Sequence, residues 1–167
     1  MTLIAIDPGK SGGIAWTEPS GESFCVPMPQ TDGDILDFLR SAFARGQRDC
    51  HIEHVCGFVG GAGAGQMFEF GKGFGFLLGC LMTIGFRVHL HHPQKWQKAL
   101  SLGSKKDHGK NWKNHLKNRA QQLFPQCEVT LKTADALLIL EYARSLGGNK
   151  PQPLPLGGGE DYTSPNL

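Results

Sequence analysis

Residues 3–16 read LIAIDPGKSGGIAW, and this stretch decides the fold. An apolar run typical of a buried strand ends at Asp7, and the letters PG that follow it predict a tight turn. A second apolar run begins near residue 12, and a third strand is predicted at 22–26. Three short strands joined by tight turns predict an antiparallel meander.

Helical and extended patterns alternate along the rest of the chain. Apolar side chains recur at helical spacing in residues 32–44, where Thr31 or Asp32 suits the N-cap. The remaining expected elements are strands at 50–55 and 86–90, helices at 66–84, 93–100, 111–123 and 133–146, a glycine-rich loop at 57–65 and a polar loop at 101–110. A meander followed by strand–helix–strand units predicts an α/β fold with a five-stranded mixed sheet flanked by helices.

Length and composition predict one globular domain followed by a tail. The 167 residues and the apolar fraction of 40% suit a single domain, placed at residues 1–147. Residues 148–167 are rich in Pro and Gly and are expected to form a loosely ordered tail. No run reaches the roughly 18 apolar residues of a membrane helix, so no membrane association is expected. The chain opens directly on a strand pattern, so we expect no signal peptide.

The cysteines predict free thiols. Five occur, at positions 25, 50, 56, 80 and 127, with no CxxC pair. This pattern favours a reducing intracellular compartment, either the cytoplasm of a host or bacterium or an organelle matrix. Zinc binding by Cys50, His51, His54 and Cys56 is disfavoured, because a strand sends these side chains to alternating faces.

Three carboxylates stand in apolar surroundings. Asp7 ends the first strand, Glu53 lies within the strand at 50–55, and Asp135 opens the last helix. Buried carboxylates are costly unless their charge is compensated, and three of them around divalent cations would make a phosphoryl-transfer site. Adjacent parallel strands would place Asp7 beside Glu53, with Asp135 arriving from a helix on the same face. The alternatives are a turn start at Asp7, a buried ion pair at Glu53 and a helix-dipole contact at Asp135.

Basic residues gather in the second half of the chain, although the net charge is only +2. Between residues 87 and 119 nine Lys and Arg side chains are opposed by one acid, Asp107. Such a block indicates a polyanionic partner, the alternative being a solvated lysine-rich helix. The candidate nucleic-acid contacts in it are Lys95, Lys98, Lys105, Lys106, Lys110 and Lys113.

Neither glycine-rich segment predicts a nucleotide cofactor. The loop at 57–65 lacks the Gly-Lys-Ser/Thr ending of a phosphate-binding loop, and residues 9–11 lack the upstream glycine. A backbone that closely approaches nucleic acid is the favoured interpretation of the loop.

Three segments together resemble the RuvC-like Holliday-junction resolvases of the ribonuclease H-like superfamily. Residues 4–15 resemble the first strand and turn of that family, residues 52–53 its second acid and residues 134–138 its last helix. Within the family, the phage and plant-chloroplast branches are the most similar, through residues 67–75, 93–98 and 122–125. The resemblance extends from about residue 2 to 146.

The resemblance implies a ribonuclease H-like fold and a homodimer that nicks four-way DNA junctions symmetrically. It implies two Mg²⁺ or Mn²⁺ ions per active site and cleavage to a 5′-phosphate and a 3′-hydroxyl. Asp7, Glu53 and Asp135 correspond to metal ligands, with Asp7 as the bridging one. The helix at 66–84 is the expected dimer interface, through Phe70, Phe74, Leu77, Leu78 and Leu81.

One position departs from the bacterial pattern, which has a further acid three residues before the last one. Lys132 stands there, so we expect it to act in catalysis by contacting the scissile phosphate or the attacking water, or else to face solvent. Water or another residue, with Glu128 as a candidate, would complete the second metal's ligands.

Further DNA contacts are expected near the first acid and the glycine-rich loop. Lys10 is a candidate phosphate contact. Phe58 and Phe74, together with Phe76, are candidates for stacking at the open centre of the junction, the alternative being core packing.

The sequence therefore predicts a structure-selective DNA endonuclease. A sugar-kinase-like or actin-like ATPase, which shares the first strand pattern, is disfavoured because 167 residues leave no room for a second copy of the fold. A non-catalytic branched-DNA-binding module stays open, because Lys132 replaces an acid.

Overall fold

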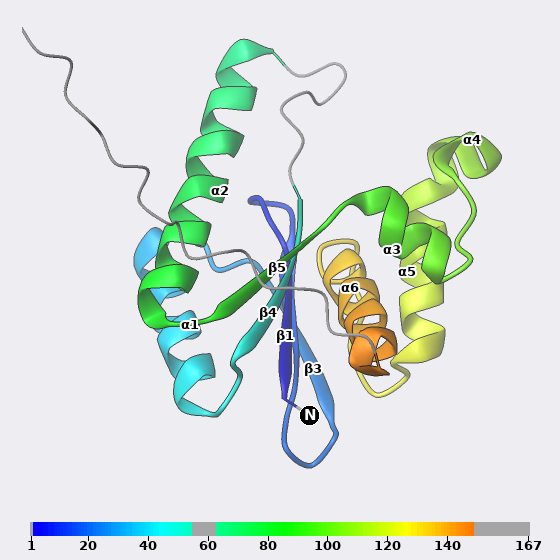
Figure 1. Ribbon diagram of the computed structural model, residues 1–167. Helices are drawn as coiled ribbons and strands as arrows, with labels where there is room; N and C mark the ends of the chain where they lie inside the picture. Colours follow the sequence, from blue (N-terminus) through cyan, green and yellow to red (C-terminus); the bar gives the residue numbers. More distant parts are fainter. Residues whose placement is uncertain (1, 55–62, 149–167) are drawn as a thin grey trace, which may run out of the picture.

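The computed structural model describes residues 2–54 and 63–148. Figure 1 shows a central sheet with α1 and α2 on one face and α3, α5 and α6 on the other. The expected tail, apart from residue 148, and most of the glycine-rich loop with Phe58 lie outside the described residues.

The sheet has five strands in the order β3-β2-β1-β4-β5. The strands are β1 (Leu3–Asp7), β2 (Gly13–Thr17), β3 (Ser23–Pro27), β4 (Asp49–Glu53) and β5 (Arg87–His91). β1, β2 and β3 pair antiparallel, whereas β4 pairs parallel with both β1 and β5. The predicted mixed sheet, a meander plus two parallel strands, is confirmed.

The helices follow the expected order. They are α1 (Asp32–Ala44), α2 (Ala64–Ile84), α3 (Pro93–Ala99), α4 (Lys105–His108), α5 (Trp112–Leu123) and α6 (Ala134–Ser145), with 3₁₀ turns η1 (Gly109–Asn111) and η2 (Leu146–Gly148). α1 begins at Asp32 because the Thr31 side chain accepts a hydrogen bond from the Asp34 amide, as an N-cap does.

The prediction of a polar loop at 101–110 is wrong, since α4 and η1 occupy residues 105–111. Ser104 and Asp107 form a capping box, in which the Asp107 carboxylate accepts from the Ser104 amide at 2.8 Å and from its hydroxyl at 2.7 Å. This single turn buries no side chain. It therefore lacks the apolar periodicity by which a helix is recognised in a sequence.

Strand alternation divides the core between the two faces of the sheet. Ile4 and Ile6 point toward α1 and α2, whereas Leu3 and Ala5 point toward α6. β1 is buried on both sides, which explains its unbroken apolar sequence. Asp7 continues the series of residues 3 and 5, so its side chain belongs to the α6 face.

Helix α2 packs against the sheet through part of the face that was predicted from the sequence to form a dimer interface. Leu77 and Leu81 are buried against the sheet, and Phe74 and Leu78 pack against the same core. The ring of Phe70 lies over the turn at Gly9. Leu77 and Leu81 therefore belong to the core of their own protomer, whereas Phe70, Phe74 and Leu78 are only partly buried, and the interface stays a prediction.

The length and composition of α2 also depart from expectation. Its 21 residues are long and apolar enough to cross a membrane by those two criteria, although no such segment was predicted. The helix nevertheless carries Glu69 and Lys72 and packs Leu77 and Leu81 onto the sheet. We therefore assign it to the folded domain.

Candidate active site

Asp7 and Glu53 end two adjacent strands on the same face of the sheet. Ile6 lies opposite Ile52 in the parallel register of β1 and β4, so the next residue of each strand is an acid. Cys50 and Ile52 face α2, which leaves Glu53 on the α6 face with Asp7. These strand ends lie away from the N-terminus, between α2 and α3 in Figure 1.

Asp135 reaches this edge from the first turn of α6. It is 5% exposed and stands among buried apolar neighbours, Ala134, Ala136 and Leu137. Gly13 permits this approach, because a Cβ there would lie 2.6 Å from the carbonyl oxygen of Lys132. Only glycine therefore lets the start of α6 settle against β2.

The charges of the three acids act on one another, so the acids lie close together. Burial raises the pKa of Asp7 to about 8, with repulsion by Asp135 and Glu53 adding to the shift. Burial likewise raises the pKa of Glu53 to about 7, and Asp135 again adds to it. Carboxylates that lie together and have raised pKa values are typical of functional sites. A cation bound among them would favour their charged form.

Two side chains contact the acids directly. The Trp96 indole in α3 donates a hydrogen bond to Glu53 Oε2 at 3.1 Å, and the tryptophan itself is fully buried. The Lys113 ammonium in α5 lies 2.5 Å from Asp135 Oδ2. Both hold a carboxylate in place from the helical layer.

The donor set fits a hard divalent cation. All three side chains offer oxygen atoms, the ligands that Mg²⁺ and Mn²⁺ prefer. Asp135 Oδ1 is buried and has no hydrogen-bond partner within the described structure. Among residues 2–54 and 63–148, no three His, Cys, Asp or Glu side chains converge closely enough to hold a metal ion as they stand. The acids therefore offer suitable ligand atoms and interact electrostatically, but they do not surround a single point in this arrangement.

Lys132 stands where the bacterial pattern has a further acid, and Glu128 is the candidate to replace that acid as a ligand. Both residues are exposed. The Lys132 amide donates to the Thr130 hydroxyl, which fixes the backbone just before α6. Lys10 is also exposed, in the turn that follows Asp7. It lines a cavity of about 490 Å³ with Phe70, Phe74 and other residues of α1 and α2.

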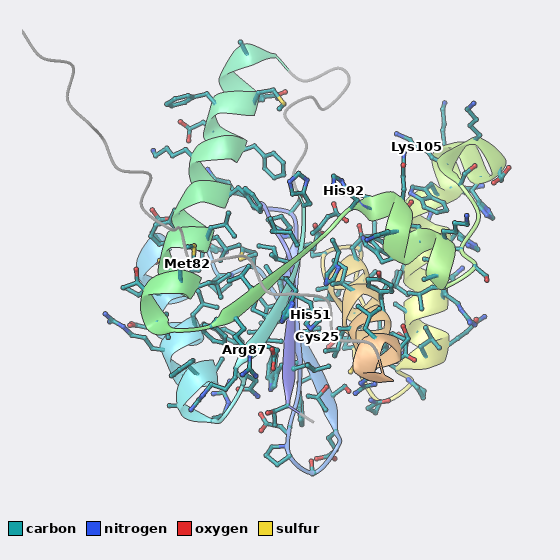
Figure 2. The ribbon with its side chains drawn as sticks, in the orientation of Figure 1. Cys25, His51, Met82, Arg87, His92 and Lys105 are labelled. Carbon is teal, nitrogen blue, oxygen red and sulfur yellow. The ribbon has the colours of Figure 1, made fainter. Side chains whose placement is uncertain are left out.

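The predicted DNA contacts lie mainly on the α6 side of the sheet. Lys95 and Lys98 belong to α3, and Lys105 and Lys106 to α4, which carries Lys105 at the far end of the helical layer (Figure 2). These four lysines and Lys110 in η1 are exposed. The structure separates Lys113 from this set by pairing it with Asp135. Phe74 is half-buried against the core.

Sequence reasoning did not assign Trp96 to the site. The feature that could have pointed to it is a tryptophan inside the strongly polar segment PQKWQK, because a large apolar side chain in such a segment is expected to be buried. Lys113 carried no signal that distinguished it from the other lysines of its block. Only the packing of α5 beside α6 brings it to Asp135.

Comparison with solved structures identifies the fold. Thermus thermophilus RuvC in complex with a Holliday junction substrate is similar, with a TM-score of 0.59 and 16% identity over 92% of this chain and 100% of that chain. A second structure of Thermus thermophilus RuvC has a TM-score of 0.54 and 17% identity, over 88% and 97% of the two chains. No protein-family model and no curated protein matches the sequence. The chain has the ribonuclease H-like fold in the arrangement found in RuvC.

Proposed function

We propose that this protein is a metal-dependent DNA endonuclease that resolves four-way junctions by paired phosphodiester hydrolysis, leaving a 5′-phosphate and a 3′-hydroxyl. The observation that carries the proposal is the group of Asp7, Glu53 and Asp135 at one end of a ribonuclease H-like sheet, in which Asp135 is buried, Asp7 and Glu53 are partly buried, and Asp135 repels both of the others. The similarity to a RuvC bound to a Holliday junction supports the choice of substrate.

Asp7, Glu53 and Asp135 would hold two Mg²⁺ or Mn²⁺ ions, with Asp7 on the central strand as the shared ligand. When bound, such ions activate water and neutralise charge on the phosphate under attack. Trp96 would keep Glu53 oriented through its indole hydrogen bond. Lys132, exposed three residues before Asp135 in the sequence, would contact the scissile phosphate.

The lysines of α3, α4 and η1 would bind the phosphate backbone. Lys95, Lys98, Lys105, Lys106 and Lys110 are exposed on the helical layer that also supplies Trp96 and Lys113 to the site. If the surface neutralises about six phosphates, the logarithm of the affinity should fall with log salt at a slope near −5. A four-way junction should bind more tightly than duplex, because bending duplex to the same shape costs up to several kcal/mol.

We propose that two copies associate through the outer face of α2, so that two active sites cut the symmetric junction. Gly71, Gly75 and Gly79 recur every four residues along this helix, and a Cβ added at any of them would meet open space in the protomer. Phe68 and Met82 are exposed on α2, at 70% and 44%. Gly75→Leu should therefore leave the protomer folded and shift light scattering toward monomer.

The alternative function is a non-catalytic branched-DNA-binding module. One observation favours it: within the described part of the chain, the acids do not converge on one point and an ammonium is bound to Asp135. Such a module would bind junction DNA and leave it intact at any metal concentration.

Nicking of a synthetic four-way junction separates the two functions. The wild-type protein should cut paired strands in Mg²⁺, cut nothing in EDTA, and leave a linear duplex of the same sequence intact. Asp7→Asn should bind the junction and not cut it. Tight junction binding without cleavage in Mg²⁺ or Mn²⁺ would contradict the enzyme and support the binding module.

A further inference from the structure

Lys113 approaches the acid site from a different layer than the acids themselves. It belongs to the first turn of α5, whereas Asp7 and Glu53 end strands and Asp135 begins α6. Its ammonium contacts Asp135 Oδ2 at 2.5 Å, although its side chain remains 58% exposed and that of Asp135 only 7%. The lysine therefore reaches inward from solvent to a buried carboxylate.

The charge of Lys113 acts on all three acids. Attraction to Lys113 lowers the pKa values of both Asp7 and Glu53, opposing the larger effect of burial. The pKa of Lys113 is itself raised: burial lowers it, but attraction to Asp135, to Asp7 and to Glu53 outweighs that effect. One ammonium thus compensates a group of carboxylates that would otherwise repel one another.

We propose that Lys113 is the resident counter-ion of the metal-free site and that it competes with a divalent cation for Asp135. The inference rests on the proposed function, because it takes Asp7, Glu53 and Asp135 to be metal ligands. Lys113 is a positioning residue in this role: it holds the acids together before metal arrives and leaves Asp135 when metal binds.

The contacts of Asp135 support a competition rather than a permanent ion pair. Lys113 engages Oδ2, while Oδ1 stays buried without a partner in the described structure. An ammonium and a divalent cation on the same carboxylate repel each other strongly at such distances. The exposed stem of Lys113 lets the ammonium withdraw to water at little cost, whereas the buried Asp135 cannot follow it.

Mn²⁺ binding in the absence of DNA tests the inference. Calorimetric titration of the full chain with Mn²⁺ alone should show about tenfold tighter binding for Lys113→Met, because the competing charge is gone. The matched control is Lys117→Met, one helical turn further along α5, which removes the same charge and should bind Mn²⁺ as the wild type does. In EDTA, Lys113→Met should melt at a lower temperature than Lys117→Met.

Unchanged or weaker Mn²⁺ binding by Lys113→Met would overturn the inference while leaving the metal site, and so the proposed function, in place. Absence of Mn²⁺ binding by wild type and variant alike would overturn both.

A measurement on the wild-type protein covers the case in which Lys113→Met does not fold. The ¹⁵Nζ resonance of Lys113, assigned by its absence in Lys113→Arg, should be detectable in EDTA because the ammonium is bound to Asp135. Saturating Mg²⁺ should broaden it through exchange with water, as for the exposed lysines. A Lys113 signal that stays unchanged at saturating Mg²⁺ would show a permanent ion pair and contradict the competition.

Discussion

The two ends of strand β4 each carry a carboxylate on the α6 face, and the two carboxylates differ in their hydrogen-bond partners. At the first end, Asp49 accepts two hydrogen bonds from Arg87, at 2.8 and 2.5 Å, and one contact from His89 at 3.1 Å. At the other end, within the described residues, Glu53 accepts one hydrogen bond, from the indole of Trp96 at 3.1 Å. Figure 2 places Arg87 at the end of the sheet opposite His92, which directly follows β5.

The pKa values report the same contrast. Hydrogen bonding by Arg87 lowers the pKa of Asp49 to about 2, whereas burial raises that of Glu53 to about 7. Asp49 is a satisfied structural ion pair. The charged form of Glu53 is disfavoured where it stands, as expected of a group that binds a cation or a proton during function.

Neutral histidines separate the two ends. His51 and His91 lie buried between them with ring nitrogens 2.8 Å apart. Burial lowers the pKa of His51 to about 3 and that of His91 to about 4, so both are uncharged at neutral pH. Neither therefore supplies positive charge to Glu53, although Glu53 and His91 are neighbours in the parallel register.

The largest expected effect is on catalysis at the unsatisfied end. If the proposed function holds, Asp7→Asn should slow junction nicking by at least ~10³-fold, equivalent to roughly 4 kcal/mol of transition-state stabilisation, because it removes the charge of a proposed metal ligand and keeps its shape. Single-turnover kinetics in Mg²⁺ measure this, with gel-shift binding to confirm that the junction is still bound. Asp49→Asn is the control and should nick at nearly the wild-type rate. Equal loss in both variants would erase the contrast between the two ends.

The second effect is on stability at the satisfied end. Asp49→Asn should lower the free energy of unfolding by about 1–3 kcal/mol, since it breaks charge-assisted hydrogen bonds from Arg87 and His89. Because the folded pKa of Asp49 is lowered, its contribution is present above the unfolded value near 4 and disappears as pH falls through about 2. Urea titrations at pH 6 and pH 2.5 should show a difference from wild type that shrinks at the lower pH.

The third effect is the opposite pH dependence of Asp7 and Glu53. Their folded pKa values, about 8 and about 7, lie above the unfolded ones. Protonation of these acids at low pH therefore stabilises the folded, metal-free protein. That stabilisation is lost as pH rises through 7 and 8. The melting temperature in EDTA should therefore fall between pH 6 and pH 9, and Asp7→Asn should show a smaller fall. A flat profile in the wild type would mean that the acids already have their charge compensated.

The smallest effect concerns the hydrogen bond that Trp96 donates to Glu53. Trp96→Phe removes the indole donor and keeps most of the buried ring, so nicking should slow by less than about tenfold, through a less well oriented Glu53. The same substitution should leave junction binding unchanged in gel shifts. A loss of nicking rate as large as that of Asp7→Asn would show that Trp96 positions more of the site than Glu53 alone.

Much of this contrast is readable in the sequence, but not all of it. Asp7, Glu53 and Asp135 are conspicuous because each interrupts an apolar element, and strand alternation is enough to place the first two on one face. Asp49 and Lys113 are not conspicuous, because their partners come from other elements, β5 in one case and α6 in the other. Patterns along a chain locate costly groups, whereas the partners that compensate them depend on packing.

The faces of α2 show the same limit. Its apolar side chains predict a buried surface, and the structure confirms burial at Leu77 and Leu81. Composition alone does not say whether that surface meets the protein's own sheet or a second copy. The glycines on the outer face become informative only once the space beyond them is known to be open.

Melting temperatures in EDTA test most directly whether the unsatisfied carboxylates form a functional site or a structural one. Asp7→Asn and Glu53→Gln should melt at or above the wild-type temperature at pH 8, because each removes a buried charge that repels its neighbours. Asp135→Asn should melt slightly lower, since Lys113 loses its partner. A sharp drop in Asp7→Asn and Glu53→Gln, of the ~3–5 kcal/mol expected when a buried ion pair is broken, would show that these acids hold the fold together and would contradict the proposed catalytic centre.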